Sequence, residues 1–265
     1  MQPQNDNVDI FVYTHKPFRQ IVSDRIYKVL TCSRDDFSGF TVPVYRDYTG
    51  DNISDKNLMY NEYTGIYWLW RNYELKKYVG INHYNRYYTF MDKPLDIEAL
   101  MLYFSLIISK RLDLTNPVTR ERMNNRDSYA YWHNVEDFDL LEQVIHEKYP
   151  EYITGFDRLK ERDYIFNSSM FIMSKESFNE YCSFIFDILG TYNQYHGHYT
   201  ADDYKTHVMS NWDKYIKPNL PYYTVEKQAR LLGYIAERAM NAYLFSNRHF
   251  AENAVCELEW ILTGH

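Results

Sequence analysis

The chain contains 265 residues, and its balance of 45% hydrophobic and 25% charged residues is typical of a globular protein with a sizeable core. Its formal net charge of −7 argues against nucleic acid as a partner, because binding to phosphates favours a basic surface. The 3 cysteines are scattered without a CxxC pair, which predicts neither a disulfide framework nor a zinc site.

Hydrophobic patterning predicts alternating strands and helices in the first half of the chain and mostly helices in the second. In chain order, strands are expected at 8–14, 41–45, 79–82, 106–109 and 169–173, and helices at 58–72, 136–148, 175–189 and 228–246. The alternation indicates one α/β domain with a mainly parallel sheet and helical additions.

Polar side chains follow several of the predicted strands at the point where each strand ends. Thr14, His15 and Lys16 follow the first strand, a TGDNIS turn follows the second, and His83 to Arg86 follow the third. Ligands bind at the carboxyl ends of strands in open α/β sheets, so we expect the three clusters to converge on one site. The alternative is that these strand ends merely face solvent.

The TGDNISDKN turn leads into a predicted helix. Ser54, Asp55 and Asn57 are all good helix N-caps, which explains part of the polarity. The exposed N–H groups of a helix start can also hold an anion. Asp51 and Asn52 precede the cap and could bind ribose hydroxyls or base edges.

The segment Asp137-Phe138-Asp139 has the DxD form that many sugar-nucleotide transferases use to hold a metal ion. On the helix expected there, residues two apart point about 200° away from each other, so both carboxylates cannot reach one ion. Acidic residues that favour a helix start are the simpler interpretation. His133 and Asn134, just upstream, keep the segment of interest.

The last predicted helix has a polar stripe at Arg230, Tyr234, Glu237 and Asn241. The stripe is either a solvated face or a wall of the cleft on which Glu237 acts as a catalytic carboxylate. The chain has no Gly-rich phosphate loop, Ser/His/Asp array or HExxH motif.

Aromatic residues are unusually abundant, with 28 Tyr, 15 Phe and 5 Trp. Their flat amphipathic faces suit sugar rings and bases. The start, MQPQNDNVD, lacks the form of a signal peptide, and no apolar run reaches the ~20 residues of a membrane span. We therefore expect a cytoplasmic protein; peripheral contact with the inner face of the membrane stays open.

Three motifs together resemble a family of bacterial capsular and exopolysaccharide glycosyltransferases, long described only as a domain of unknown function. TGDNISDKN, NEYTGIYWLWRN and YVGINHYNRYY are similar to the family pattern TGDNIS-K-N, E-T-YW-WKN and Y-G-HYRRYF. Later segments, including EDFDLLEQVIHEKYPEYITGFD and GYIAERAMNAYL, extend the resemblance over most of the chain.

The resemblance implies a GT-A-like fold. It also implies an enzyme that transfers a hexose, of galactose type, from a UDP-sugar to a polysaccharide or lipid-linked glycan. It implies one domain at 1–247, with a nucleotide-binding part at about 8–110, an acceptor part at about 111–247, and a C-terminal tail at 248–265. The nucleotide-sugar residues that it implies are Thr14, His15, Lys16, Asp51, Asn52, Ser54, Lys56, Asn57, His83, Tyr84, Arg86 and Tyr87. Residues expected on the acceptor or sugar side are Glu62, His133, Asn167 and Arg238, and the candidate catalytic bases are Glu237 and then Asp137.

Several positions depart from the family pattern. Asn85 stands where the family commonly has Arg, which weakens the case for two arginines on the diphosphate. Asn167 begins a strand that usually starts with Phe-Asn, and the stretch 190–221, which includes HGH, matches no pattern.

No metal ligand is predicted. Asn82 and His83 stand where metal-dependent relatives would have their DxD, so a divalent manganese or magnesium ion is allowed but not favoured. Two other functions stay open: a non-catalytic carbohydrate-binding protein and a sugar-nucleotide hydrolase.

Overall fold

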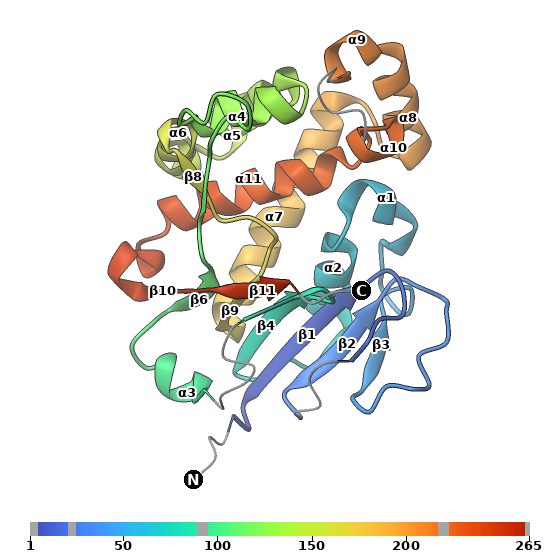
Figure 1. Ribbon diagram of the computed structural model, residues 1–265, viewed down its shortest axis with the longest axis vertical. Coiled ribbons are helices and arrows are strands. Elements are labelled where there is room, and N and C mark those ends of the chain that lie inside the picture. The colour runs from blue at the N-terminus through green and yellow to red at the C-terminus, as the bar shows by residue number, and fades with distance from the viewer. Residues whose placement is uncertain (1–4, 21–24, 89–94, 217–222, 263–265) are drawn as a thin grey trace.

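A nine-stranded sheet forms the centre of the chain in the computed structural model, which describes residues 5–20, 25–88, 95–216 and 223–262 (Figure 1). Its strands are β1 (Val8–Thr14), β2 (Tyr27–Thr31), β3 (Val44–Arg46), β4 (Tyr78–His83), β5 (Arg86–Tyr88), β6 (Leu106–Ser109), β9 (Phe171–Ser174), β10 (Val255–Leu258) and β11 (Trp260–Leu262). The short strands β7 (Leu112–Asp113) and β8 (Tyr164–Ile165) form a separate pair.

The strand order is β10-β6-β9-β4-β1-β2-β3, with β5 pairing β4 and β11. Strands β3, β2, β1 and β4 run parallel, whereas β9 lies antiparallel between β4 and β6. The predicted fold class is confirmed: a mixed, mostly parallel sheet is flanked by helices, and the second half of the chain is largely helical.

The helices lie mostly on one side of the sheet. They are α1 (Asn57–Tyr60), α2 (Tyr63–Asn72), α3 (Ile97–Leu100), α4 (Asn125–Trp132), α5 (Val135–Lys148), α6 (Ile153–Glu161), α7 (Lys175–His196), α8 (Ala201–Ser210), α9 (Trp212–Tyr215), α10 (Val225–Gln228) and α11 (Leu231–Ser246). Figure 1 shows α4 to α11 gathered above the sheet and α3 near its opposite end. None of the helices in the described residues is long and apolar enough to cross a membrane.

The alternating side chains of β1 explain why both faces of the sheet are covered. Phe11 and Tyr13 pack into the large core shared with α2, α7 and α11. Val8, Ile10 and Val12 point to the opposite face, into a smaller core with residues of β5 and α3. A fully buried strand of this kind fixes its carboxyl end firmly against the helical layer.

The helix expected at 58–72 is broken in two at Asn61, whose φ of 52° is left-handed. The start of α11 packs against this break. A Cβ on Gly233 would lie 1.8 Å from Asn61 Nδ2, and Arg230 Nε donates a hydrogen bond of 2.5 Å to Asn61 Oδ1. The break thus depends on a contact across most of the sequence, which the local pattern does not encode.

Two further differences concern the strands of the sheet. No strand is predicted from the sequence at Tyr27–Thr31, yet β2 pairs with β1 there. The segment after residue 247, expected to be a tail, contributes β10 beside β6 and β11 beside β5, and its last three residues lie outside the described part. The division of the chain into nucleotide and acceptor parts stays a prediction.

Candidate active site

A cavity of about 560 Å³ opens at the carboxyl ends of β1 and β4. Its wall comes from the ends of these strands, from α1, from the turn between β4 and β5, from the segment before β9, and from α11. The lining residues are Tyr13, Thr14, His15, Asn57, Leu58, Asn61, Glu62, His83, Tyr84, Asn85, Arg86, Ser168, Arg230, Gly233, Tyr234 and Glu237.

The cavity brings together the polar clusters that follow β1 and β4, but not the TGDNIS turn, from which only the later Asn57 contributes. The predicted site residues on its wall are Thr14, His15, Asn57, Glu62, His83, Tyr84, Arg86 and Glu237. Most of these follow β1 or β4, because adjacent parallel strands end at the same edge of the sheet. Glu237 reaches the same place from α11, nearly the other end of the chain.

The polar side chains of the TGDNIS turn mainly bond to neighbouring residues of the chain and so stabilise the turn. The Asp51 carboxylate pairs with Arg71 at 2.8 Å, the Asn52 amide donates to the Gly50 carbonyl at 2.9 Å, and the Ser54 hydroxyl donates to Asp47 Oδ1 at 2.8 Å. None of these predicted nucleotide ligands lines the cavity, and Lys56 does not line it either.

Asp47, which the sequence does not single out, is fully buried and contacts Tyr13 of the cavity wall. Thr64 donates to its Oδ2 at 2.7 Å, and Tyr13 donates to the same oxygen at 3.4 Å. Asn57 in turn donates to the Tyr13 hydroxyl at 2.7 Å. This network ties the start of α1 and α2 to β1, and thereby fixes Asn57 on the wall.

Other predicted site residues also lie off the wall. The Lys16 ammonium lies 5.6 Å from the centre of the Tyr84 ring, and Tyr87 is buried in the core on the far face of the sheet. The ring of His133 stacks on Tyr234 with centroids 4.1 Å apart, and the Asn167 carbonyl accepts from Ser109.

The two remaining predicted residues off the wall are charged. The Arg238 guanidinium lies 4.9 Å from the centre of the Tyr129 ring and donates to Glu237. Asp137, on α5, is buried beside Tyr215 and His196. Of the two candidate bases, Glu237 lines the cavity and Asp137 does not.

Ser168 contacts three residues of the cavity wall. His83 Nε2 bonds to its carbonyl, Arg86 Nη1 donates to its hydroxyl at 2.7 Å, and its own N–H donates to Glu237 Oε1 at 2.9 Å. Ser168 and Ser169 both have positive φ, 72° and 47°, a conformation that is uncommon outside glycine. Such strain persists where surrounding contacts fix it, and here it aims three groups at three site residues.

The protonation states of the wall are shifted by burial. Desolvation raises the pKa of Glu62 and of Glu237, and Arg230 and Arg86 oppose the rise at Glu62. Burial and the nearby Arg86 charge lower the pKa of His83 to about 4. His83 is thus neutral at pH 7, and because its Nε2 faces a carbonyl, that nitrogen carries the proton.

The positive charge of the cavity comes from arginine. Arg86 lines the cavity from the start of β5, and Arg230 lines it from the start of α11. Arg230 lies on the polar stripe noted in the sequence, but its position beside Asn61 and Glu62 depends on the docking of α11 on α1. Two guanidinium groups in one cavity suit a diphosphate, whose oxygens accept forked hydrogen bonds.

Both carboxylates of the cavity have neighbours within the chain. Glu237 Oε1 accepts from Ser168 and its Oε2 accepts from Arg238 at 3.0 Å. Glu62 Oε1 lies 3.9 Å from His83 Nε2. Within the described ranges, the side-chain groups with metal-ligand spacing are His196, His198 and His207, and Glu142, His146 and Asp157, and neither group lines the cavity.

Comparison with known proteins adds a family and a structural neighbour. Residues 9–216 match the model of a family described as a domain of unknown function, DUF4422. A solved structure titled WbbM bifunctional glycosyltransferase, in its apo form, matches with a TM-score of 0.72 and 25% identity. The match covers 98% of this chain and 46% of that one, so the chain spans less than half of its neighbour. A search of curated proteins finds no significant match.

Proposed function

Because this chain belongs to the DUF4422 family and nearly all of it resembles part of a glycosyltransferase, we propose that it transfers a sugar from a nucleotide donor to a glycan. The observation that carries the proposal is the cavity at the strand ends, where two arginines face two partly buried carboxylates. We further propose a UDP-hexose of galactose type as the donor. The acceptor would be a capsular, exopolysaccharide or O-antigen chain, lipid-linked at the inner face of the membrane.

In this proposal Arg86 and Arg230 bind the departing diphosphate. Their charge stabilises the negative charge that develops on the leaving group, which is the main task in glycosyl transfer. Thr14, His15 and Asn57 lie along the same wall and suit the nucleotide. Neutral His83 contributes hydrogen bonding rather than charge. We propose that these residues carry the task without a catalytic manganese or magnesium ion.

Glu237 is proposed as the general base of an inverting transfer. Its raised pKa brings the carboxylate closer to the basicity needed to take a proton from an acceptor hydroxyl. The Ser168 N–H and the Arg238 guanidinium hold its two oxygens, which fixes its direction. Glu62 lies close enough to raise the pKa of Glu237 further.

A thermal-shift screen of sugar nucleotides tests the donor proposal, because a ligand that binds only the folded state raises Tm. We expect UDP and one UDP-hexose to raise Tm, and Arg86→Ala to abolish the rise. The matched control is Arg126→Ala: Arg126 forms an exposed ion pair with Asp139, and this variant should keep the rise. A chain that ignores every nucleotide sugar contradicts the proposal and favours a carbohydrate-binding protein.

The reaction products distinguish a sugar-nucleotide hydrolase from a transferase. Donor consumption is measured with and without glycan acceptors, and the fate of the sugar is followed by mass spectrometry. A transferase joins the sugar to the acceptor and consumes donor faster when the acceptor is present. Equal consumption in both conditions, with only free sugar released, identifies a hydrolase.

A further inference from the structure

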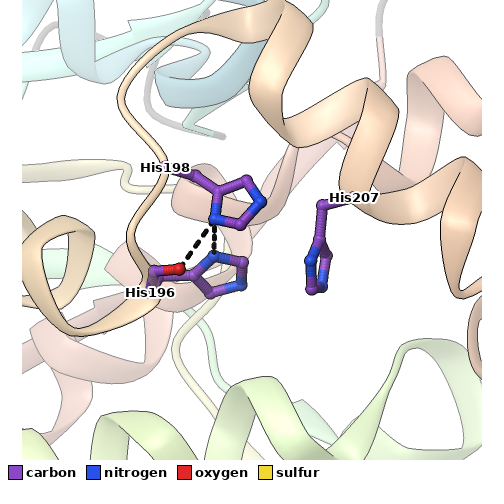
Figure 2. Close-up of side chains that lie close together, drawn as sticks. All are labelled: His196, His198 and His207. Carbon is purple, nitrogen blue, oxygen red and sulfur yellow. Dashed lines mark hydrogen bonds between the residues drawn. The ribbon is translucent and has the colours of Figure 1, made fainter.

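Three histidine side chains gather where α7 meets α8, outside the candidate active-site cavity (Figure 2). His196 is the last residue of α7, and His207 lies on α8. Gly197, between His196 and His198, adopts a left-handed φ of 74°, which reverses the chain and turns His198 back towards His196. One nitrogen of each ring lies within 4.8 Å of a nitrogen of each of the others.

The rings face one another closely. Their centroids are 4.5 Å apart for His196 and His198, 4.6 Å for His196 and His207, and 4.7 Å for His198 and His207. The Nδ1 atoms of His196 and His198 are 2.9 Å apart, so they can share one proton or bind one cation, but cannot both carry a proton.

A simple hydrogen-bonded histidine pair explains only part of this arrangement. His198 Nδ1 lies 2.7 Å from the His196 carbonyl, which accounts for the turn. It leaves the His207 ring unexplained, because in the part of the chain that the structure describes no group hydrogen-bonds that ring.

Asp137 supplies a second, independent feature. Its Oδ1 lies 3.8 Å from His196 Nε2 and accepts from the Tyr215 hydroxyl at 3.0 Å. Asp137 is only 3% exposed, and its Oδ2 has no hydrogen-bond partner among the described residues. With Nε2 turned towards the carboxylate, Nδ1 of His196 faces Nδ1 of His198. A carboxylate behind a histidine in this way is the usual support of a metal ligand.

We propose that His196, His198 and His207 bind one divalent transition-metal ion, with zinc as the best match, and that Asp137 positions His196. Imidazole nitrogens suit zinc, whereas magnesium and manganese prefer oxygen ligands. Three histidines and one water complete the tetrahedral shell of zinc. An ion bound there would join the end of α7 to α8.

The metal would stabilise a layer that borders the cavity. The Tyr204 hydroxyl on α8 donates to Asn193 Oδ1 at 2.7 Å, and Asn193 Nδ2 donates to the Tyr60 hydroxyl on α1 at 3.1 Å. Asn57, at the other end of α1, lines the cavity. Holding α8 in place therefore supports the position of α1.

The test uses the full chain, without a histidine tag and stripped of metal, titrated with zinc by calorimetry. We expect one zinc per chain and a Tm that rises by about 5–10 °C when zinc exceeds Kd a hundredfold. Cobalt in place of zinc should give the visible absorption of a tetrahedral site. No zinc binding by the wild-type chain, or binding without any rise in Tm, overturns the proposal.

Variants locate the ion. His207→Ala should weaken zinc binding at least a hundredfold, and Asp137→Asn about 10- to 100-fold. The matched control, His249→Ala, removes an exposed histidine elsewhere and should change nothing. His198→Gln gives a second test at the cluster if His207→Ala lowers the metal-free Tm. Wild-type zinc affinity in both cluster variants overturns the assignment.

Discussion

At the scale of single residues, Glu237 has the clearest expected role. Replacing it by Gln keeps the size of the side chain and one acceptor oxygen but removes the base. We expect Glu237→Gln to lower turnover by about 10²–10⁴-fold and to leave UDP binding unchanged, as measured by calorimetry. Glu161→Gln, an exposed carboxylate on α6, is the control. Unchanged turnover in Glu237→Gln would remove Glu237 from the mechanism.

Glu62 allows a test of the coupling between the two carboxylates. Burial is the main cause that raises the pKa of Glu237, Arg238 opposes it, and the charge of Glu62 adds to it. Glu62→Gln removes that charge, so the pKa of Glu237 falls and its basic form persists to lower pH. The acidic limb of the kcat/KM profile should therefore move to lower pH, whereas an unmoved limb would show that Glu237 does not govern it.

The Glu62→Gln variant should also change how the stability of the fold depends on pH. The folded state raises the pKa of Glu62 above its ordinary value of 4.5, so Glu62 stabilises the fold at low pH. The wild-type chain loses that contribution as pH rises through the raised pKa, and Glu62→Gln does not. We therefore expect Glu62→Gln to have the higher Tm at neutral pH and no such advantage in acid.

At the scale of elements, the contact between α11 and the break after α1 is the critical one. Gly233→Ala would place a Cβ 1.8 Å from Asn61 Nδ2 and push the two helices apart. We expect a loss of about 1–3 kcal/mol in the free energy of unfolding, measured with denaturant, and weaker donor binding as Arg230 moves. Gly190→Ala is the control: a Cβ there meets nothing within 4 Å, so this helical position should gain about 0.5–1 kcal/mol.

At the scale of the whole molecule, the C-terminal strand contacts Arg86, a residue of the cavity wall. Strand β11 pairs with β5, and the Trp260 ring lies 5.5 Å from the Arg86 guanidinium. We expect Trp260→Ala to weaken UDP binding about 2- to 30-fold, the range of a cation–π contact, with less effect on turnover at saturation. Trp260→Phe should restore most of the affinity, and equal affinity in all three proteins would contradict the role of this contact.

Much of the frame could be predicted from the sequence, because local patterns determine it. β1 and β6 have the predicted bounds, and β4 and α5 lie where expected because their apolar residues recur at the right period. Helix α7 begins at Lys175 as predicted but continues past the predicted end at 189 to His196. The expectation that polar strand ends share one site rested on sheet geometry, and it located His15, His83 and Arg86 on one wall.

The remainder depends on contacts between distant segments. Ser168 reads as an ordinary residue before a strand, and only the fold brings it to His83, Arg86 and Glu237. Asp51 and Asn52 carry the polarity of a ligand-binding turn but use it to hold the turn and α2 together. Polar residue types alone do not distinguish these two uses.

The cluster of His196, His198 and His207 bears on how any ion requirement of this chain is read. Loss of activity in a chelating buffer is commonly taken to mean that a cation touches the substrate. Here the same loss would follow if an ion left the junction of α7 and α8 and α1 then shifted. Adding magnesium or manganese back would restore a substrate-bound cation, whereas only zinc-like ions would restore the junction. The ion that restores activity therefore shows whether the chelator had removed a cation from the substrate or from the histidine cluster.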